Sequence, residues 1–197
     1  MEPVVSFRAM ARVKSPEKRG AILEAVVREI AEGGLGASTA SIAGRAGIAA
    51  GTLFTYFATK EELLNELYLE LKAEVYARIN VGFPHKASLE RRARHVWSSY
   101  LAWAIEFPEK RKVSVQLNVS DVITQETRKR TEAVRSAIDT TLSEVAKLGG
   151  LRGMPEGFAA SLMAAMQEAT MEHVAKQPRR REEILERAFK VFWRSVR

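Results

Sequence analysis

The chain of 197 residues contains no cysteine, which excludes disulfide bonds, thiolate zinc sites and a cysteine nucleophile. Its three histidines, His85, His95 and His173, show no ligand pairing, and no carboxylate pair stands out. No glycine-rich phosphate loop follows a strand. We therefore predict no metal site, no cofactor and no catalytic residue, and the case for an enzyme is weak.

Long apolar runs and a secretion signal are also absent. No stretch approaches the roughly 18 continuous apolar residues that a membrane span needs, and the first residues lack a charged lead followed by an apolar core. We expect a soluble, cytoplasmic protein without a membrane partner. A chain of this length buries a sizeable core, so its stability should come from packing alone.

The net charge of +7 is concentrated at the two ends of the chain. Residues 1–60 carry eight basic and five acidic groups and residues 176–197 carry eight and three, whereas the middle is nearly neutral. Because lysines and arginines that neutralise phosphates release counterions, this excess indicates a polyanionic partner. Charged ends that only keep the protein soluble explain it equally well, so charge alone leaves both interpretations open.

The first third of the chain has the pattern of three short helices. Apolar residues at helical spacing predict a first helix that ends at Gly33-Gly34. Ser38 is a hydroxyl N-cap for a short helix through Arg45, and Gly47 supplies a turn position with positive φ. A second short helix is predicted from about Ala49 to Phe57, with Leu53, Phe54 and Phe57 assigned to packing.

The rest of the chain is also helical, and no segment alternates like a strand for long. Thr59 opens a Thr-x-x-Glu capping box for a long fourth helix that ends near residue 82. The sequence thus predicts an all-α protein of about nine helices, with a three-helix domain over 1–60 and a helical domain over 61–197 joined by the fourth helix. The five later helices are expected over 88–107, 109–119, 121–148, 155–175 and 180–197.

The segment 38–60, STASIAGRAGIAAGTLFTYFATK, is the most informative part of the chain. It resembles the signature of the TetR family of transcriptional regulators. The resemblance implies an N-terminal helix-turn-helix, a C-terminal domain that dimerises and binds a small-molecule effector, and repression from an inverted-repeat operator in double-stranded DNA. The motifs that carry it are Ile42-Ala43, Ala46-Gly47-Ile48, Gly51-Thr52-Leu53, Tyr56-Phe57 and Lys60-Glu61.

A helix-turn-helix works because its second helix enters the major groove while the first crosses the DNA backbone. Small residues at 49–51 leave the start of the second helix unobstructed, so its amides can meet a phosphate or base edge. Thr52 and Thr55 can exchange hydrogen bonds with DNA, and Tyr56 and Lys60 suit phosphate contacts, which fix register without reading sequence.

By resemblance, the phosphate-contacting positions are Ser38, Thr52, Tyr56 and Lys60. The base-reading positions fall around Arg45, Ala49, Ala50 and Thr55, and Gly51 completes the predicted DNA-binding set. Positions 49 and 50 depart from the family, which often has serine and a longer polar residue there. Base specificity then depends on Arg45, on thymine methyl groups, or on the basic arm Arg8–Arg19, which is equally well explained as a solvated tail.

A dimer is expected, because symmetric regulators pair two recognition helices across a dyad. The last two helices combine small residues that permit close approach with large apolar ones, and in the family they resemble half of a four-helix bundle between protomers. The alternative is that both helices belong to the core of one protomer. The predicted interface residues are Leu162, Ala165, Ala169, Phe189, Phe192 and Trp193.

The apolar content of the fifth to eighth helices exceeds what one packing seam needs, and it favours a cavity for a small apolar or aromatic effector. Each residue taken alone is also explained as plain core. The predicted ligand-binding residues are Trp97, Tyr100, Trp103, Phe107, Asn118, Met163, Met166 and Gln167.

The resulting hypothesis is that the effector biases the fourth helix and changes the separation of the two recognition helices. Two other functions stay open. One is a helical interaction or scaffold protein in which the helix-turn-helix is only a core motif, and the other is a DNA-binding regulator that responds to no ligand.

Overall fold

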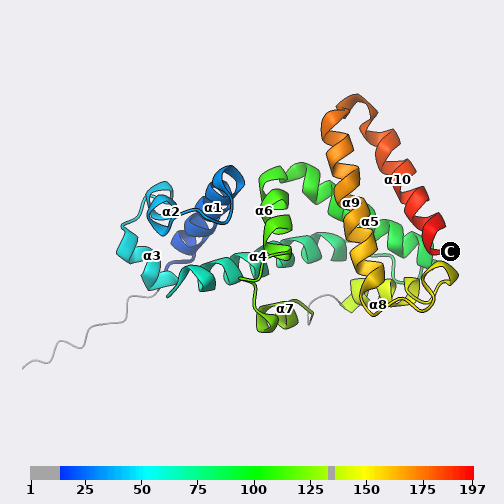
Figure 1. Ribbon diagram of the computed structural model, residues 1–197, viewed down its shortest axis with the longest axis horizontal. Helices are drawn as coiled ribbons and strands as arrows, with labels where there is room; N and C mark the ends of the chain where they lie inside the picture. Colours follow the sequence, from blue (N-terminus) through cyan, green and yellow to red (C-terminus); the bar gives the residue numbers. More distant parts are fainter. Residues whose placement is uncertain (1–13, 133–135) are drawn as a thin grey trace, which may run out of the picture. The chain divides into compact units, whose positions relative to one another are not determined.

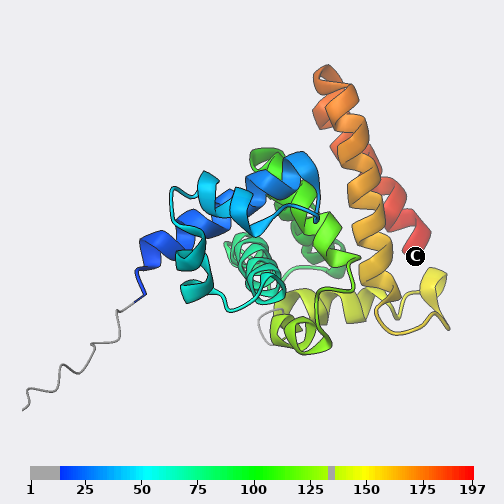
Figure 2. The same ribbon diagram turned by 60° about the vertical axis from the view of Figure 1, so that its left-hand side comes forward.

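The computed structural model describes residues 14–132 and 136–197, and every regular element in these ranges is helical (Figures 1 and 2). The predicted all-α fold class is therefore confirmed. In the same ranges, no helix has the length and apolar character that crossing a membrane requires. The elements are α1 (Pro16–Gly33), α2 (Thr39–Arg45), α3 (Ala50–Tyr56), α4 (Lys60–Asn80), α5 (Leu89–Glu106), α6 (Pro108–Asn118), α7 (Gln125–Glu132), α8 (Ser136–Val145), the 3-10 helix η1 (Gly149–Leu151), α9 (Phe158–Lys176), the 3-10 helix η2 (Pro178–Arg180) and α10 (Arg181–Val196).

The chain divides into two compact units, Met1–Leu63 and Leu64–Arg197. The N-terminal unit contains α1, α2, α3 and the first turn of α4. The C-terminal unit contains the remainder of α4 and all later helices. Helix α4 therefore begins in one unit and continues into the other.

Side-chain caps fix where the helices of the N-terminal unit begin. The Ser38 hydroxyl accepts a hydrogen bond from the backbone N–H of Ser41 at 3.0 Å. The Thr59 hydroxyl accepts one from the N–H of Glu62 at 3.0 Å, and the Glu62 carboxylate accepts one from the N–H of Ala58 at 2.7 Å. These bonds satisfy amides that a helix leaves unpaired at its start. Both predicted caps are confirmed.

The core of the N-terminal unit forms where α2 packs on α1 and α3 packs on α2. The apolar spacing of α1 directs one stripe of side chains inward, as the periodicity predicts. Gly47, in the turn between α2 and α3, has a φ of 66°, which confirms the predicted positive-φ position. The most deeply buried side chains of this unit are Ile22, Val26, Ile30, Ile42, Leu53, Phe57 and Leu63.

Helix α5 is central to the C-terminal unit and packs against α8, α9 and α10. The Trp97 ring lies 5.9 Å from the ring of Phe189 and 5.7 Å from that of Phe192, measured between centroids. All three side chains are buried. Helices α9 and α10 run antiparallel side by side and are joined through η2 (Figure 1). The aromatic cluster thus fixes α10 onto α5.

The region 121–148, which we predicted as a single helix, contains α7 and α8 on either side of residues 133–135, which lie outside the described residues. With both counted, the described residues hold ten α-helices, against about nine predicted. Helix α7 begins only at Gln125, because the Thr124 hydroxyl accepts a hydrogen bond from the N–H of Thr127 at 3.1 Å. The side chain of Asn65 holds the preceding turn by bonding the carbonyl of Val122 and the N–H of Thr124.

Candidate functional site

Helices α2 and α3 form a helix-turn-helix within the N-terminal unit. The turn is closed by a backbone hydrogen bond from Ile48 N–H to the Ala43 carbonyl at 3.0 Å. Helix α3 has seven residues, and Ala49 at its N-cap provides no side-chain hydrogen bond. Leu53 is fully buried and anchors α3 to the unit. The second helix of the motif is thereby held by one face, while its other face is exposed.

The exposed residues of α3 are small or apolar. Ala50, Gly51, Phe54 and Thr55 are exposed, whereas Thr52 is half-buried. The assignment of Phe54 to packing was wrong, because its side chain is 46% exposed. Residues 53 and 57 are four apart and share the buried face, whereas Phe54 falls about 100° away on the face of Ala50. Helical spacing within 50–57 is the signal that separates it from the two buried residues.

Three of the predicted phosphate-contacting residues already have partners within the unit. The Tyr56 hydroxyl accepts a hydrogen bond from the N–H of Ser15 at 3.0 Å, and the Lys60 ammonium donates to the Leu35 carbonyl at 2.8 Å. The Ser38 hydroxyl caps α2 as described above. These bonds position the side chains on the motif. A DNA contact by Tyr56 or Lys60 must use the remaining hydrogen-bonding capacity of each group.

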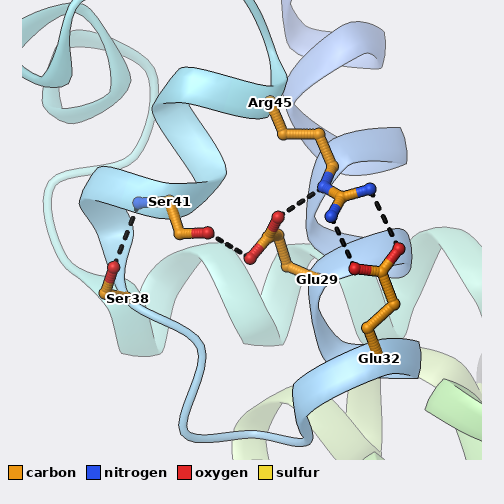
Figure 3. A network of polar contacts seen from close by, with 5 residues as sticks. All are labelled: Glu29, Glu32, Ser38, Ser41 and Arg45. Atoms are coloured by element: carbon orange, nitrogen blue, oxygen red, sulfur yellow. Dashed lines mark hydrogen bonds and ion pairs between the residues drawn. The ribbon is translucent and has the colours of Figure 1, made fainter.

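Arg45, predicted to read bases, is held by two carboxylates of α1 (Figure 3). Its Nε donates to Glu29, and its Nη1 and Nη2 donate to the two oxygens of Glu32 at 3.0 and 2.6 Å. The Ser41 hydroxyl also donates to Glu29. Hydrogen bonds from Ser41 and then from Arg45 lower the pKa of Glu29, and those to Glu29 and Glu32 raise the pKa of Arg45. This network ties α2 to α1.

A cavity of about 300 Å³ lies within the C-terminal unit, with lining residues from α4, α5, α6, α8 and α9. Of the predicted ligand-binding residues, it brings together Tyr100, Asn118, Met163 and Gln167. The predicted ligand-binding residues include none from α4 or α8, because the apolar stripes of these helices look the same whether they line a cavity or fill a core. The apolar lining includes Val75, Ile79, Val96, Ile138, Leu142 and Met163.

One side of the cavity has a fixed polar network. The Tyr100 hydroxyl donates to one oxygen of Glu168, and Arg111 donates to the other. Burial, followed by the hydrogen bond to Glu168, raises the pKa of Tyr100 well above its ordinary value, so this hydroxyl stays protonated. The Gln167 amide donates to the Trp97 carbonyl at 3.3 Å. An apolar cavity with a few oriented polar groups has the character of a small-molecule site.

The other four predicted ligand-binding residues lie elsewhere. Trp97 lines a separate groove of about 470 Å³ between α5 and α10, and Met166 lines a groove between α9 and α10. Trp103 is buried and donates its ring N–H to Glu74 at 3.4 Å, while Phe107 is half-buried after the end of α5. None of these four residues lines the cavity formed by α4, α5, α6, α8 and α9, hereafter the five-helix cavity.

The predicted dimer residues divide into two groups. Phe189 and Phe192 are 1% and 0% exposed within one protomer, so they have almost no surface to offer a partner. Ala165 and Ala169 on α9 are exposed, and Leu162 and Trp193 are half-buried. The groove of about 350 Å³ between α9 and α10 is lined in part by Ala169 and by Val191, which is 56% exposed and was missed by sequence reasoning.

A helix-turn-helix unit of three helices, followed by an all-helical unit with a cavity, is an arrangement found in DNA-binding regulators. Residues 22–67, which extend from α1 into α4, match the family model described as bacterial regulatory proteins, tetR family. The N-terminal unit therefore carries the signature of TetR-family regulators, and the whole chain is similar to solved structures assigned to that family.

Solved structures extend the similarity beyond the matched residues. A protein from Shewanella sp. PV-4 assigned to the TetR family is 26% identical, with a TM-score of 0.75 over 90% of this chain and 97% of that chain. FadR from Bacillus subtilis, solved with stearoyl-CoA, is 20% identical, with a TM-score of 0.67 over 90% and 99%. LfrR from Mycobacterium smegmatis, solved with proflavine, is 21% identical, with a TM-score of 0.63 over 90% and 96%. The shared fold therefore includes the C-terminal unit.

Proposed function

We propose that the protein binds an inverted-repeat operator as a homodimer, represses transcription in the cytoplasm, and is released by a small apolar or aromatic effector. The observation that carries the DNA-binding part is the exposed face of α3 on a helix-turn-helix whose other face is anchored by Leu53. The excess of basic residues at the chain ends supports the same partner. An occupied operator needs no further contact to block a promoter.

The dimer that we propose uses the exposed face of α9 and α10. Ala165 and Ala169 permit close approach of helices, and Val191 adds an exposed apolar side chain beside the groove between the two helices. Two copies of such a face form a self-complementary interface across a two-fold axis. The two recognition helices then meet half-sites about 34–36 Å apart, or a multiple of that distance.

The effector site that we propose is the five-helix cavity rather than the grooves beside α10. Its volume, like those of the two grooves, falls in the range of small-molecule sites, but of the three it alone has lining residues from α4, Val75 and Ile79 among them. The same helix begins within the N-terminal unit. A ligand that displaces α4 would therefore change the spacing of the recognition helices. The complexes of FadR with stearoyl-CoA and of LfrR with proflavine support a ligand that has a large apolar part.

The experiment that tests DNA binding selects bound duplexes from a random library and titrates the enriched sequence with the full chain. We expect an inverted repeat, bound by a dimer, with weaker binding at higher salt. Tyr56→Phe should weaken binding modestly, because it loses a hydroxyl of the recognition helix, whereas the exposed Val81→Ala on the other unit should not. If no sequence is enriched, the helix-turn-helix is a core motif of a scaffold protein.

The effector is tested by screening apolar and aromatic compounds for release of the labelled operator. Because coupling is reciprocal, the operator should weaken effector binding by the same factor by which the effector weakens operator binding. Ala160→Phe, at a half-buried residue of the cavity lining, should narrow the cavity and abolish the response while DNA binding persists. A protein that binds its operator and responds to none of these compounds would support the ligand-independent regulator instead.

The Arg45 network gives a separate prediction. Arg45→Lys keeps the charge but loses the planar fork that engages Glu29 and Glu32 together. We expect a melting temperature lower by a few degrees and weaker operator binding, with the same preferred base at every position. The control is Arg28→Lys on the exposed side of α1. A changed base preference in Arg45→Lys alone would mean that Arg45 reads a base.

A further inference from the structure

The exposed face of α3 is short of hydrogen-bond donors. Of its four exposed residues, Ala50, Gly51 and Phe54 have no polar side-chain atom. The fourth, Thr55, donates its hydroxyl hydrogen to the Gly51 carbonyl at 3.2 Å, within the helix itself. Guanine is usually read by arginine or lysine and adenine by asparagine or glutamine. None of these four residue types occurs in α3.

Arg45 does not readily supply the missing donors. Its Nε and both terminal nitrogens are directed to Glu29 and Glu32. Reading a guanine would require the guanidinium to leave two carboxylates, which would remain as negative charges near the DNA phosphates. The network therefore favours Arg45 as a positioning residue for α2.

Phe54 is the largest side chain on the exposed face of α3, at 46% exposure. It lies four residues after Ala50, so the two side chains share one side of the helix. The major groove offers one apolar feature that distinguishes bases, the C5 methyl group of thymine. An exposed phenyl ring beside an alanine methyl complements that group.

We propose that α3 reads its operator mainly through thymine methyl groups, with Phe54 as the specificity-determining residue and Ala50 beside it. This inference rests on the proposed function, since it requires an operator. Burial of one methyl group against an apolar surface strengthens binding about fourfold. In a symmetric dimer two half-sites contribute, which gives about 15-fold.

The test uses the operator recovered from the random library and replaces each thymine in turn by uracil. Uracil keeps the Watson–Crick pairing and removes only the methyl group. We expect one or two positions in each half-site at which the symmetric replacement weakens binding about 15-fold. Phe54→Ala should bind the thymine operator more weakly and lose its sensitivity to uracil at those positions, which is the coupling that a double-mutant cycle measures.

Two controls separate this inference from the proposed function. Val81→Ala, at a side chain that is 74% exposed in the C-terminal unit, should keep the full sensitivity to uracil. Circular dichroism of Phe54→Ala checks that the variant folds. An operator that is enriched but equally well bound with uracil, or a sensitivity that survives in Phe54→Ala, overturns the inference alone. Failure to enrich any operator overturns the proposed function and this inference with it.

Discussion

Replacing Phe192 by alanine is expected to lower the free energy of unfolding by about 3–5 kcal/mol. The side chain is fully buried within one protomer, and its ring centroid lies 5.7 Å from that of Trp97 and 6.2 Å from that of Phe189. Truncation removes aromatic contacts and leaves a cavity that the cluster only partly fills. Because this cluster fixes α10 onto α5, the truncation should destabilise the whole C-terminal unit.

This loss is measured by urea denaturation of Phe192→Ala at two protein concentrations, with tryptophan fluorescence as the signal that reports unfolding. The stability of a dimer depends on concentration, so the two concentrations separate protomer core from interface. We expect the same large loss at both. Val81→Ala, with an exposed side chain, should have little effect. If the variant keeps its protomer stability but dissociates more readily, Phe192 belongs to the dimer interface, as the sequence predicted.

Val191→Asp is expected to abolish the proposed dimer and to weaken operator binding about 100-fold or more. Val191 is exposed on α10 beside the groove that faces the proposed partner. A carboxylate there would have to lose its hydration in an apolar contact, and by symmetry the interface would contain two such like charges. The separated protomers would then each contact DNA through one recognition helix, instead of two acting together.

Sedimentation equilibrium of Val191→Asp measures the oligomeric state, and operator titration measures the affinity. The matched control is Val81→Asp, which introduces the same charge at another exposed valine of the same unit. The control should remain dimeric and bind the operator normally. If Val191→Asp also remains dimeric, the protomers associate through a different face.

The local features of the N-terminal unit could be predicted because they depend on neighbouring residues. The hydroxyl caps at Ser38 and Thr59 and the positive φ of Gly47 follow from chemistry within four residues. The apolar stripe of α1 likewise follows from its own spacing. Such signals define where helices begin, turn and bury a face.

The remaining features depend on contacts between residues far apart in the sequence. No local pattern indicates that Arg45 pairs with Glu29 and Glu32, which precede it by 16 and 13 positions. The stripe containing Phe189 and Phe192 predicts burial but does not identify the surface that buries it. Lining a cavity and filling a core also require the same apolar residues. These properties depend on how the helices pack together.

The exposed face of α3 has a consequence for the evolution of binding preference. Substitutions of surface residues usually change the free energy of unfolding by no more than about 0.5 kcal/mol. Positions 50, 54 and 55 are exposed, whereas Leu53 holds the helix in place. Gene copies descended from this regulator could therefore diverge in the promoters they control through changes at these three positions, without compensating mutations elsewhere in the chain.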